Sequence, residues 1–62
     1  MMIFAEACIG GAVAYSPDVW GVVNGERTPE AAARKFAQQR GHADIAPIPE
    51  FSDKTTLAFT AI

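Results

Sequence analysis

The stretch TPEAAARKFAQQRG, residues 28–41, has the pattern of one helix with both ends marked, and the flanking segments are interpreted around it. Thr28 is the expected N-cap, because its hydroxyl can accept a hydrogen bond from a free backbone N–H group of the first turn. Pro29 suits the first helical position, where an N–H group would lack a partner in any case. Gly41 suits the position just beyond the last turn, where the backbone often has a positive φ.

The inward face of this predicted helix consists mostly of alanine. Ala33, Phe36 and Ala37 fall on one side at helical spacing, and only Phe36 among them is large. Because alanine side chains are short, the helix can lie close to a sheet, with one aromatic side chain inserted between the layers.

Apolar stretches with the length of β-strands lie on both sides of the helix. They are residues 3–9, 12–15 and 19–24 before it and residues 55–62 after it. Gly10-Gly11 predicts a tight hairpin between the first two, and Asn24-Gly25 is expected to end the third. Residues 43–50 contain Pro47 and Pro49, so they form at best an edge strand or an extended arm.

This order of elements predicts an α+β fold of the form ββ(β)αβ. We expect a two-layer sandwich, in which one helix covers one face of an antiparallel sheet of three to four strands. We expect a single domain over residues 1–62, since a chain of this length buries only about 60% of its unfolded surface. The other sheet face is then either solvated or covered by a partner, and a homodimer is a common remedy for a small core.

Alternation within residues 3–9 separates the two faces of the first strand. Phe4, Glu6 and Cys8 would share one face, and Ile3 and Ala5 would lie on the other. This pattern is typical of a strand that packs on a core with one face only.

The charged residues are segregated along the chain, although the formal net charge is only −2. Residues 1–26 contain three acids and no base, residues 27–40 four bases and one acid, and residues 41–62 three acids and one base. One interpretation is a solvated helix face whose bases complement the helix dipole. The other is a dipolar surface, with acids that engage a basic protein or a helix that contacts phosphate. The excess of acids disfavours tight nucleic-acid binding.

Side chains that could support catalysis are scarce. His42 is the only histidine and Cys8 the only cysteine, and we expect His42 to be exposed beyond the helix. His42 and Asp44 would offer two metal ligands, fewer than the three or four that a zinc site uses. Gly10-Gly11 lacks the spacing and the lysine of a phosphate-binding loop. We therefore expect no enzyme, no metal and no cofactor, and infer a binding role by exclusion.

The expected location is the cytoplasm. Ala12-Val13-Ala14 has the form of a signal-peptide cleavage site, but no basic residue precedes Arg27, and Glu6 interrupts the apolar stretch. No stretch approaches the length of about 18 apolar residues that a membrane span requires. A single cysteine forms no internal disulfide, so Cys8 is expected to be reduced and buried as a small apolar side chain.

Three aromatic residues are candidates for a binding surface, namely Tyr15, Trp20 and Phe51. Tyr and Trp are frequent anchors of protein interfaces, although in so short a chain all three could instead be core residues. Trp20 is the most informative, because it follows Pro17 in an expected bend and precedes Gly21, where the backbone can come close to another group.

The order of residues 13–32 resembles the core of HicB-type antitoxins. VAYSPDVWGVV, residues 13–23, is similar to that family's aromatic strand and its Pro-(Asp/Glu)-hydrophobic-x-Gly bend, and TPEAA, residues 28–32, is similar to its helix start. The matching positions are Tyr15, Pro17, Asp18, Gly21, Thr28 and Glu30. Trp20 departs from the pattern, since the family often has Pro there.

The resemblance implies a partly degraded RNase H-like, or double-stranded-RNA-binding-like, fold. It also implies a protein that binds and blocks a small RNA-cleaving toxin, often as a dimer. The chain ends at Ile62 without the DNA-binding tail of many relatives, so we expect inhibition of the toxin rather than operator binding.

Two other functions remain open. A phage- or mobile-element-encoded inhibitor of the anti-CRISPR kind would place its acids in the DNA-binding groove of a host defence complex. The acids in question are Asp18, Glu26, Asp44, Glu50 and Asp53. The other function is that of an accessory domain that dimerises. All three act by covering a protein surface, with no membrane and no direct nucleic-acid contact.

Overall fold

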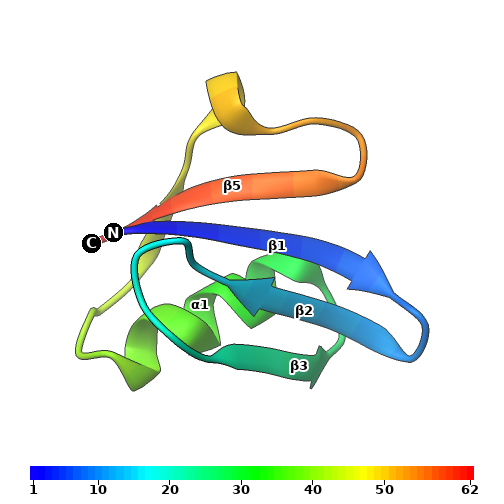
Figure 1. Cartoon of the computed structure of the whole chain (residues 1–62), viewed down its shortest axis with the longest axis horizontal. Helices are drawn as coiled ribbons and strands as arrows, with labels where there is room; N and C mark the ends of the chain where they lie inside the picture. Colours follow the sequence, from blue (N-terminus) through cyan, green and yellow to red (C-terminus); the bar gives the residue numbers. More distant parts are fainter.

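The computed structural model describes all 62 residues and contains one antiparallel sheet and one α-helix (Figure 1). The elements in chain order are β1 (Met2–Cys8), β2 (Gly11–Tyr15), β3 (Val22–Glu26), α1 (Pro29–Gln39), β4 (Ile45–Pro47), the 3-10 helix η1 (Pro49–Phe51) and β5 (Thr56–Ala61). The predicted α+β class is confirmed. The prediction of three to four strands is wrong, because the sheet has five, in the order β3-β2-β1-β5-β4.

The additional strand is β4, in the segment that the sequence left open between an edge strand and an extended arm. It pairs with β5 at the sheet edge, with Ile45 opposite Ala61 and Pro47 opposite Phe59. An edge position tolerates proline, because the N–H group that Pro47 lacks would not be needed by a further strand.

The helix begins and ends where the sequence predicts. The N–H group of Ala31 donates a hydrogen bond of 3.1 Å to Oγ1 of Thr28, which is the N-cap. Arg40 is the C-cap, and Gly41 follows it with a φ of 87°. Neither α1 nor η1 has the length and apolar character that a membrane-spanning helix needs.

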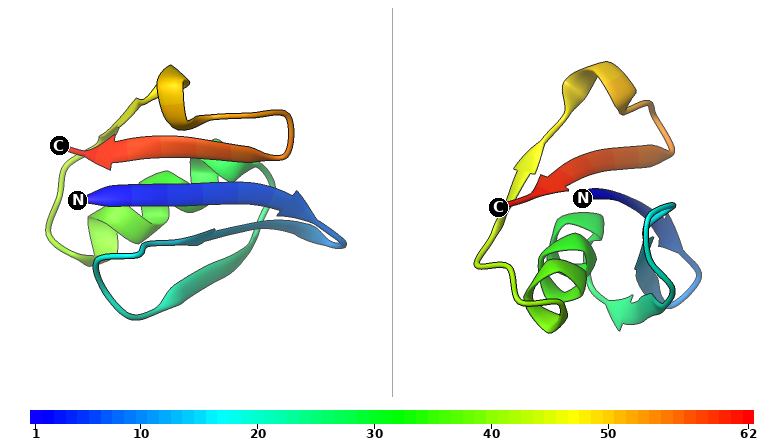
Figure 2. Two further views of the ribbon diagram at one scale, coloured as in Figure 1. Left: turned by 45° about the horizontal axis from the view of Figure 1, so that its top comes forward. Right: turned by 60° about the vertical axis from the view of Figure 1, so that its left-hand side comes forward.

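The core lies where α1 meets the sheet, on the face of the sheet that α1 covers (Figure 2). Eleven buried residues form one cluster, and they are Ala32, Ala33, Phe36 and Ala37 of α1 together with Ile3, Ala5, Ala12, Ala14, Val23, Ile45 and Phe59. Phe36 and Ile3 are the largest fully buried side chains. The inward stripe predicted for the helix is therefore confirmed, as is the placement of Ile3 and Ala5 on the inner face of β1.

The third strand differs from its prediction in position. It spans Val22–Glu26 rather than residues 19–24, and Asn24-Gly25 lies within it instead of ending it. The register against β2 shifts between Ala12 and Val13, and Gly25, with a φ of 85°, is the extra residue of this β-bulge. Glycine adopts a positive φ at little cost, so pairing with β2 continues past the position where the sequence suggested a turn.

Two single residues also differ from their predictions. Cys8 is exposed rather than buried, because it ends β1 beside the hairpin and lies opposite Gly11, which has no side chain to cover it. His42 is half-buried rather than exposed. Its backbone N–H group donates a hydrogen bond of 3.1 Å to the carbonyl oxygen of Ala37, which holds the residue against the helix end.

Candidate protein-binding surface

The connection between β2 and β3, residues 16–21, presents the most prominent aromatic side chain of the molecule. We call this segment the Trp20 loop. Trp20 is 97% exposed and Val19 is 41% exposed. Trp20 is therefore not a core residue of this chain, because its side chain packs on nothing in it. A fully exposed tryptophan is unusual in a soluble domain and is typical of a binding site.

The first half of the loop is bonded to the start of β1. Oγ of Ser16 donates a hydrogen bond of 2.5 Å to the carbonyl oxygen of Met2, and the N–H group of Met2 donates one of 3.0 Å to Oδ2 of Asp18. The N–H group of Asp18 in turn donates a hydrogen bond of 3.0 Å to Oγ of Ser16. Asp18 therefore holds the loop in place, which is a structural role beside its predicted role in partner binding.

The second half of the loop is bonded to the end of α1. Nη2 of Arg40 donates a hydrogen bond of 2.7 Å to the carbonyl oxygen of Trp20, and Nη1 donates one of 3.3 Å to the carbonyl oxygen of Phe36. The Arg40 guanidinium also lies over the Phe36 ring, 3.6 Å from its centroid. Gly21 lets the guanidinium approach, since a Cβ atom at this position would overlap Nη2.

These contacts fix the backbone on both sides of Trp20 while its side chain stays in solvent. Residues 16–22 line an open hollow at this loop. Ser16 and Asp18, which line it, are both engaged in the loop's own hydrogen bonds. An ordered loop that presents an aromatic side chain loses less conformational entropy on binding than a mobile one. The arrangement can therefore present an aromatic side chain to another molecule.

Beside the loop, three apolar side chains form a row across the sheet face opposite α1. Val22, Tyr15 and Phe4 are register partners on β3, β2 and β1. The rings of Phe4 and Tyr15 are 5.9 Å apart between centroids, and Val22 is 60% exposed. Tyr15, a predicted site residue, thus adjoins the Trp20 loop through Val22.

The hydroxyl group of Tyr15 is bonded to a carboxylate on the same face. It donates a hydrogen bond of 3.1 Å to Oε2 of Glu6. Partial burial raises the pKa of Tyr15 above its ordinary value, and the hydrogen bond and charge of Glu6 raise that pKa further. The tyrosine is therefore a neutral hydrogen-bond donor at physiological pH.

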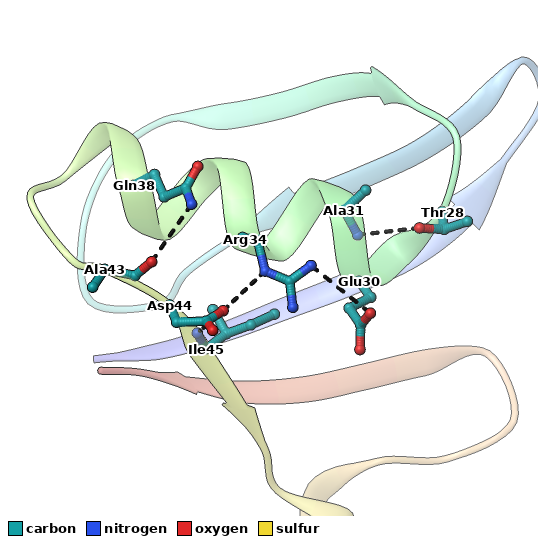
Figure 3. A network of polar contacts seen from close by, with 8 residues as sticks. All are labelled: Thr28, Glu30, Ala31, Arg34, Gln38, Ala43, Asp44 and Ile45. Atoms are coloured by element: carbon teal, nitrogen blue, oxygen red, sulfur yellow. Dashed lines mark hydrogen bonds and ion pairs between the residues drawn. The ribbon is translucent and has the colours of Figure 1, made fainter.

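Two of the predicted acidic site residues are engaged with the bases of α1. Nζ of Lys35 lies 3.3 Å from Oε2 of Glu26. Nε of Arg34 lies 2.9 Å from Oδ1 of Asp44, as drawn in Figure 3. The Arg34 hydrogen bond lowers the pKa of Asp44, and the N–H group of Ile45 lowers it further. The charges that are segregated in the sequence are thus partly paired in space.

The other two acids, Glu50 and Asp53, lie on the far side of β5 from the Trp20 loop, in η1 and in the turn that follows it. Oδ1 of Asp53 accepts hydrogen bonds of 2.8 Å from the N–H groups of Thr55 and Thr56. These bonds lower the pKa of Asp53. The Asp53 carboxylate therefore stabilises the turn before β5. Phe51, in η1, is also remote from the loop. The structure therefore brings Tyr15, Asp18 and Trp20 together and leaves the remaining acids apart.

Several residues of this surface were not identified from the sequence. Phe4 and Val22 could have been found from strand alternation, which places them opposite the core face. The sequence around Arg40 does not indicate its role in this surface, because its partner Trp20 is twenty residues away. The His, Cys, Asp and Glu side chains gather nowhere in groups of three that could hold a metal ion.

Comparison with protein-family models, with curated proteins and with solved structures finds no match to this chain.

Proposed function

We propose that this chain is a small inhibitor that binds and blocks a nucleic-acid-acting protein, in the manner of a HicB-like antitoxin against an RNA-cleaving toxin. The observation that carries the proposal is Trp20, an exposed aromatic side chain on a loop whose backbone is bonded at both ends. Interfaces concentrate binding energy in a few such anchors, and Trp is the commonest of them together with Tyr and Arg.

The stretch that resembles HicB-type antitoxins is also the stretch that builds this surface. Asp18 bonds the loop to β1, Gly21 admits the Arg40 guanidinium, and Thr28 caps α1. Trp20, the position that departs from the pattern, occupies the most exposed point of the loop. We infer that this tryptophan contributes to the choice of partner.

Docking through Trp20 has better support than charge mimicry of the anti-CRISPR kind. A mimic of nucleic acid needs several free carboxylates on one surface. Glu26 and Asp44 are in ion pairs, and Asp53 accepts hydrogen bonds within its own turn. Asp18 also accepts a hydrogen bond from the backbone of β1.

The experiment is co-expression with the neighbouring reading frame in the source genome. We expect that frame to encode a small basic RNA-cleaving protein whose expression alone arrests growth. Co-expression of this chain should restore growth, and Trp20→Ala should abolish the rescue. Phe51→Ala is the matched control, because Phe51 is another exposed aromatic residue on the far side of β5.

The proposal is overturned if the neighbouring product does not arrest growth, or if wild-type chain does not relieve the arrest. Rescue by Trp20→Ala as complete as by Phe51→Ala would refute the role of the loop. Circular dichroism of both variants checks that each is folded before growth is scored.

A further inference from the structure

The sheet face opposite α1 carries a single charged side chain among apolar and neutral polar ones. We call this side the helix-free face, defined by Phe4, Glu6, Val13, Tyr15, Val22 and Thr56. Phe4 and Glu6 alternate with the buried Ile3 and Ala5, which places them away from the core. The face is continuous with the Trp20 loop, because Val22 begins the strand that follows the loop.

Glu6 lies near the middle of this face, on β1, the third of the five strands in the sheet. Its Oε2 atom accepts the hydrogen bond from Tyr15 and a longer one of 3.5 Å from Oγ1 of Thr56. Its Oε1 atom has no hydrogen-bond partner, and Glu6 takes part in none of the ion pairs of the molecule. One carboxylate oxygen is therefore free to accept a donor from outside the chain.

No base of this chain forms an ion pair with that carboxylate. None of the five strands contains a lysine or an arginine. Of the five bases, three lie in α1 or at its end, Arg27 lies in the segment before α1, and Lys54 lies in the turn before β5. Arg34, Lys35 and Arg40 are occupied by other partners.

The unpaired carboxylate restricts what can cover the face. A carboxylate that is removed from water without a cation is strongly destabilising, and the penalty cancels much of the gain from burying Phe4, Tyr15 and Val22. A second copy of this chain, docked by the same face, would bring another Glu6 toward the first and add repulsion. A partner with a positive charge among apolar side chains would satisfy both requirements.

We propose that the helix-free face binds a protein segment that presents an arginine between apolar side chains, and that this arginine pairs with Glu6. Arginine suits the position better than lysine, because its planar donors can reach a carboxylate oxygen while its plane stacks on the Tyr15 ring. The inference rests on the proposed role as a binding protein, and it does not depend on the identity of the toxin.

The test is selection of random peptides displayed on phage against the immobilised full chain. We expect the selected peptides to be enriched in arginine flanked by apolar residues. Each selected peptide is then synthesised with arginine and with citrulline, its neutral analogue. The citrulline form should bind about tenfold to a hundredfold more weakly, as expected for a hydrogen bond between charged groups.

Variants of the chain locate the pairing. Glu6→Gln should lower the affinity for the arginine peptide by the same factor and leave the affinity for the citrulline peptide unchanged. Glu50→Gln is the matched control, since Glu50 is exposed in η1 and takes part in no ion pair, and it should leave both affinities unchanged. Amide shifts in the NMR spectrum should map to β1, β2 and β3.

Three results would overturn the inference. The first is a set of selected peptides without enrichment of arginine, and the second is equal affinity for the arginine and citrulline forms. The third is a dimer of the chain in sedimentation whose interface covers Phe4 and Tyr15. If growth rescue succeeds while these peptide results are negative, the proposed function stands and only the arginine pairing fails. If the peptides bind as expected while rescue fails, the face is a binding site for another partner.

Discussion

Arg40 joins the end of α1 to the Trp20 loop through a hydrogen bond of 2.7 Å from its Nη2 atom to the carbonyl oxygen of Trp20. The same guanidinium stacks on the ring of Phe36, which is fully buried. One side chain thus connects the most buried aromatic residue of the molecule with the most exposed one. The position of the candidate binding loop therefore depends on the helix end.

Replacement of Arg40 should loosen the loop without unfolding the protein. In Arg40→Ala we expect faster hydrogen exchange at the amides of residues 18–21, since the Trp20 carbonyl loses its donor and the loop loosens. The free energy of unfolding in urea should fall by about 1–2 kcal/mol through loss of the hydrogen bonds and the cation–π contact. Arg27→Ala removes an exposed base that forms no ion pair, and it should change stability by less than about 0.5 kcal/mol. Unchanged exchange in the loop of Arg40→Ala would contradict this role.

Gly21→Ala should be destabilising for two separable reasons. The φ of 117° at Gly21 disfavours any side chain by about 1–2 kcal/mol, and the added Cβ atom would overlap Nη2 of Arg40. In an Arg40→Ala background the overlap disappears and only the backbone cost remains. A double-mutant cycle by urea denaturation should therefore give non-additive losses. Strictly additive losses would mean that the two residues are not in contact in solution.

Loss of the Phe36 ring should remove most of the stability of so small a core. Phe36→Ala leaves a cavity between α1 and the sheet, and such changes cost about 3–5 kcal/mol. We expect this variant to lose the near-ultraviolet circular dichroism of the folded chain at 25 °C, while Phe36→Leu keeps it. Phe51→Ala, which truncates an exposed ring, should unfold like the wild type. A cooperative, wild-type transition in Phe36→Ala would show that the ring is not the anchor of the helix.

Acid should destabilise the fold through Asp44 and Asp53. The Arg34 hydrogen bond lowers the pKa of Asp44, and the N–H groups of Thr56 and Thr55 lower the pKa of Asp53. A carboxylate with a pKa lower in the folded than in the unfolded state stabilises the fold above its ordinary pKa, and this stability is lost as the pH falls through the folded pKa. The urea midpoint should therefore drop below about pH 4.

Amide replacements test this pH dependence. In Asp44→Asn/Asp53→Asn the two side chains no longer titrate, so the urea midpoint should fall less between pH 6 and pH 3 than it does in the wild type. The change of the urea midpoint with pH is compared, and not its absolute value, because the double variant starts from a lower stability at neutral pH. Parallel slopes would assign the acid sensitivity to other groups.

The sequence by itself determined the elements whose signals are local. Thr28 and Gly41 mark the ends of α1, because capping depends on residues within one turn of the helix. The alternation of Ile3 and Ala5 with Phe4 and Glu6 separated the two faces of β1, since side chains of a strand alternate with a period of two. The expected bend identified Trp20 as a candidate contact, but the sequence did not determine whether its side chain is exposed.

Only the tertiary structure decided the features that depend on segments remote in sequence. The bulge at Gly25, the pairing of β4 with β5 and the bond from Arg40 to Trp20 each join positions whose local residues allow other arrangements. The same holds for Asp44, which is acidic in a count of charges but pairs with Arg34 in space. Local propensity determines which backbone conformations have a low free energy. The packing of the strands and the helix determines which side chains are in contact. The contacts that hold Trp20 in its exposed position belong to the second kind.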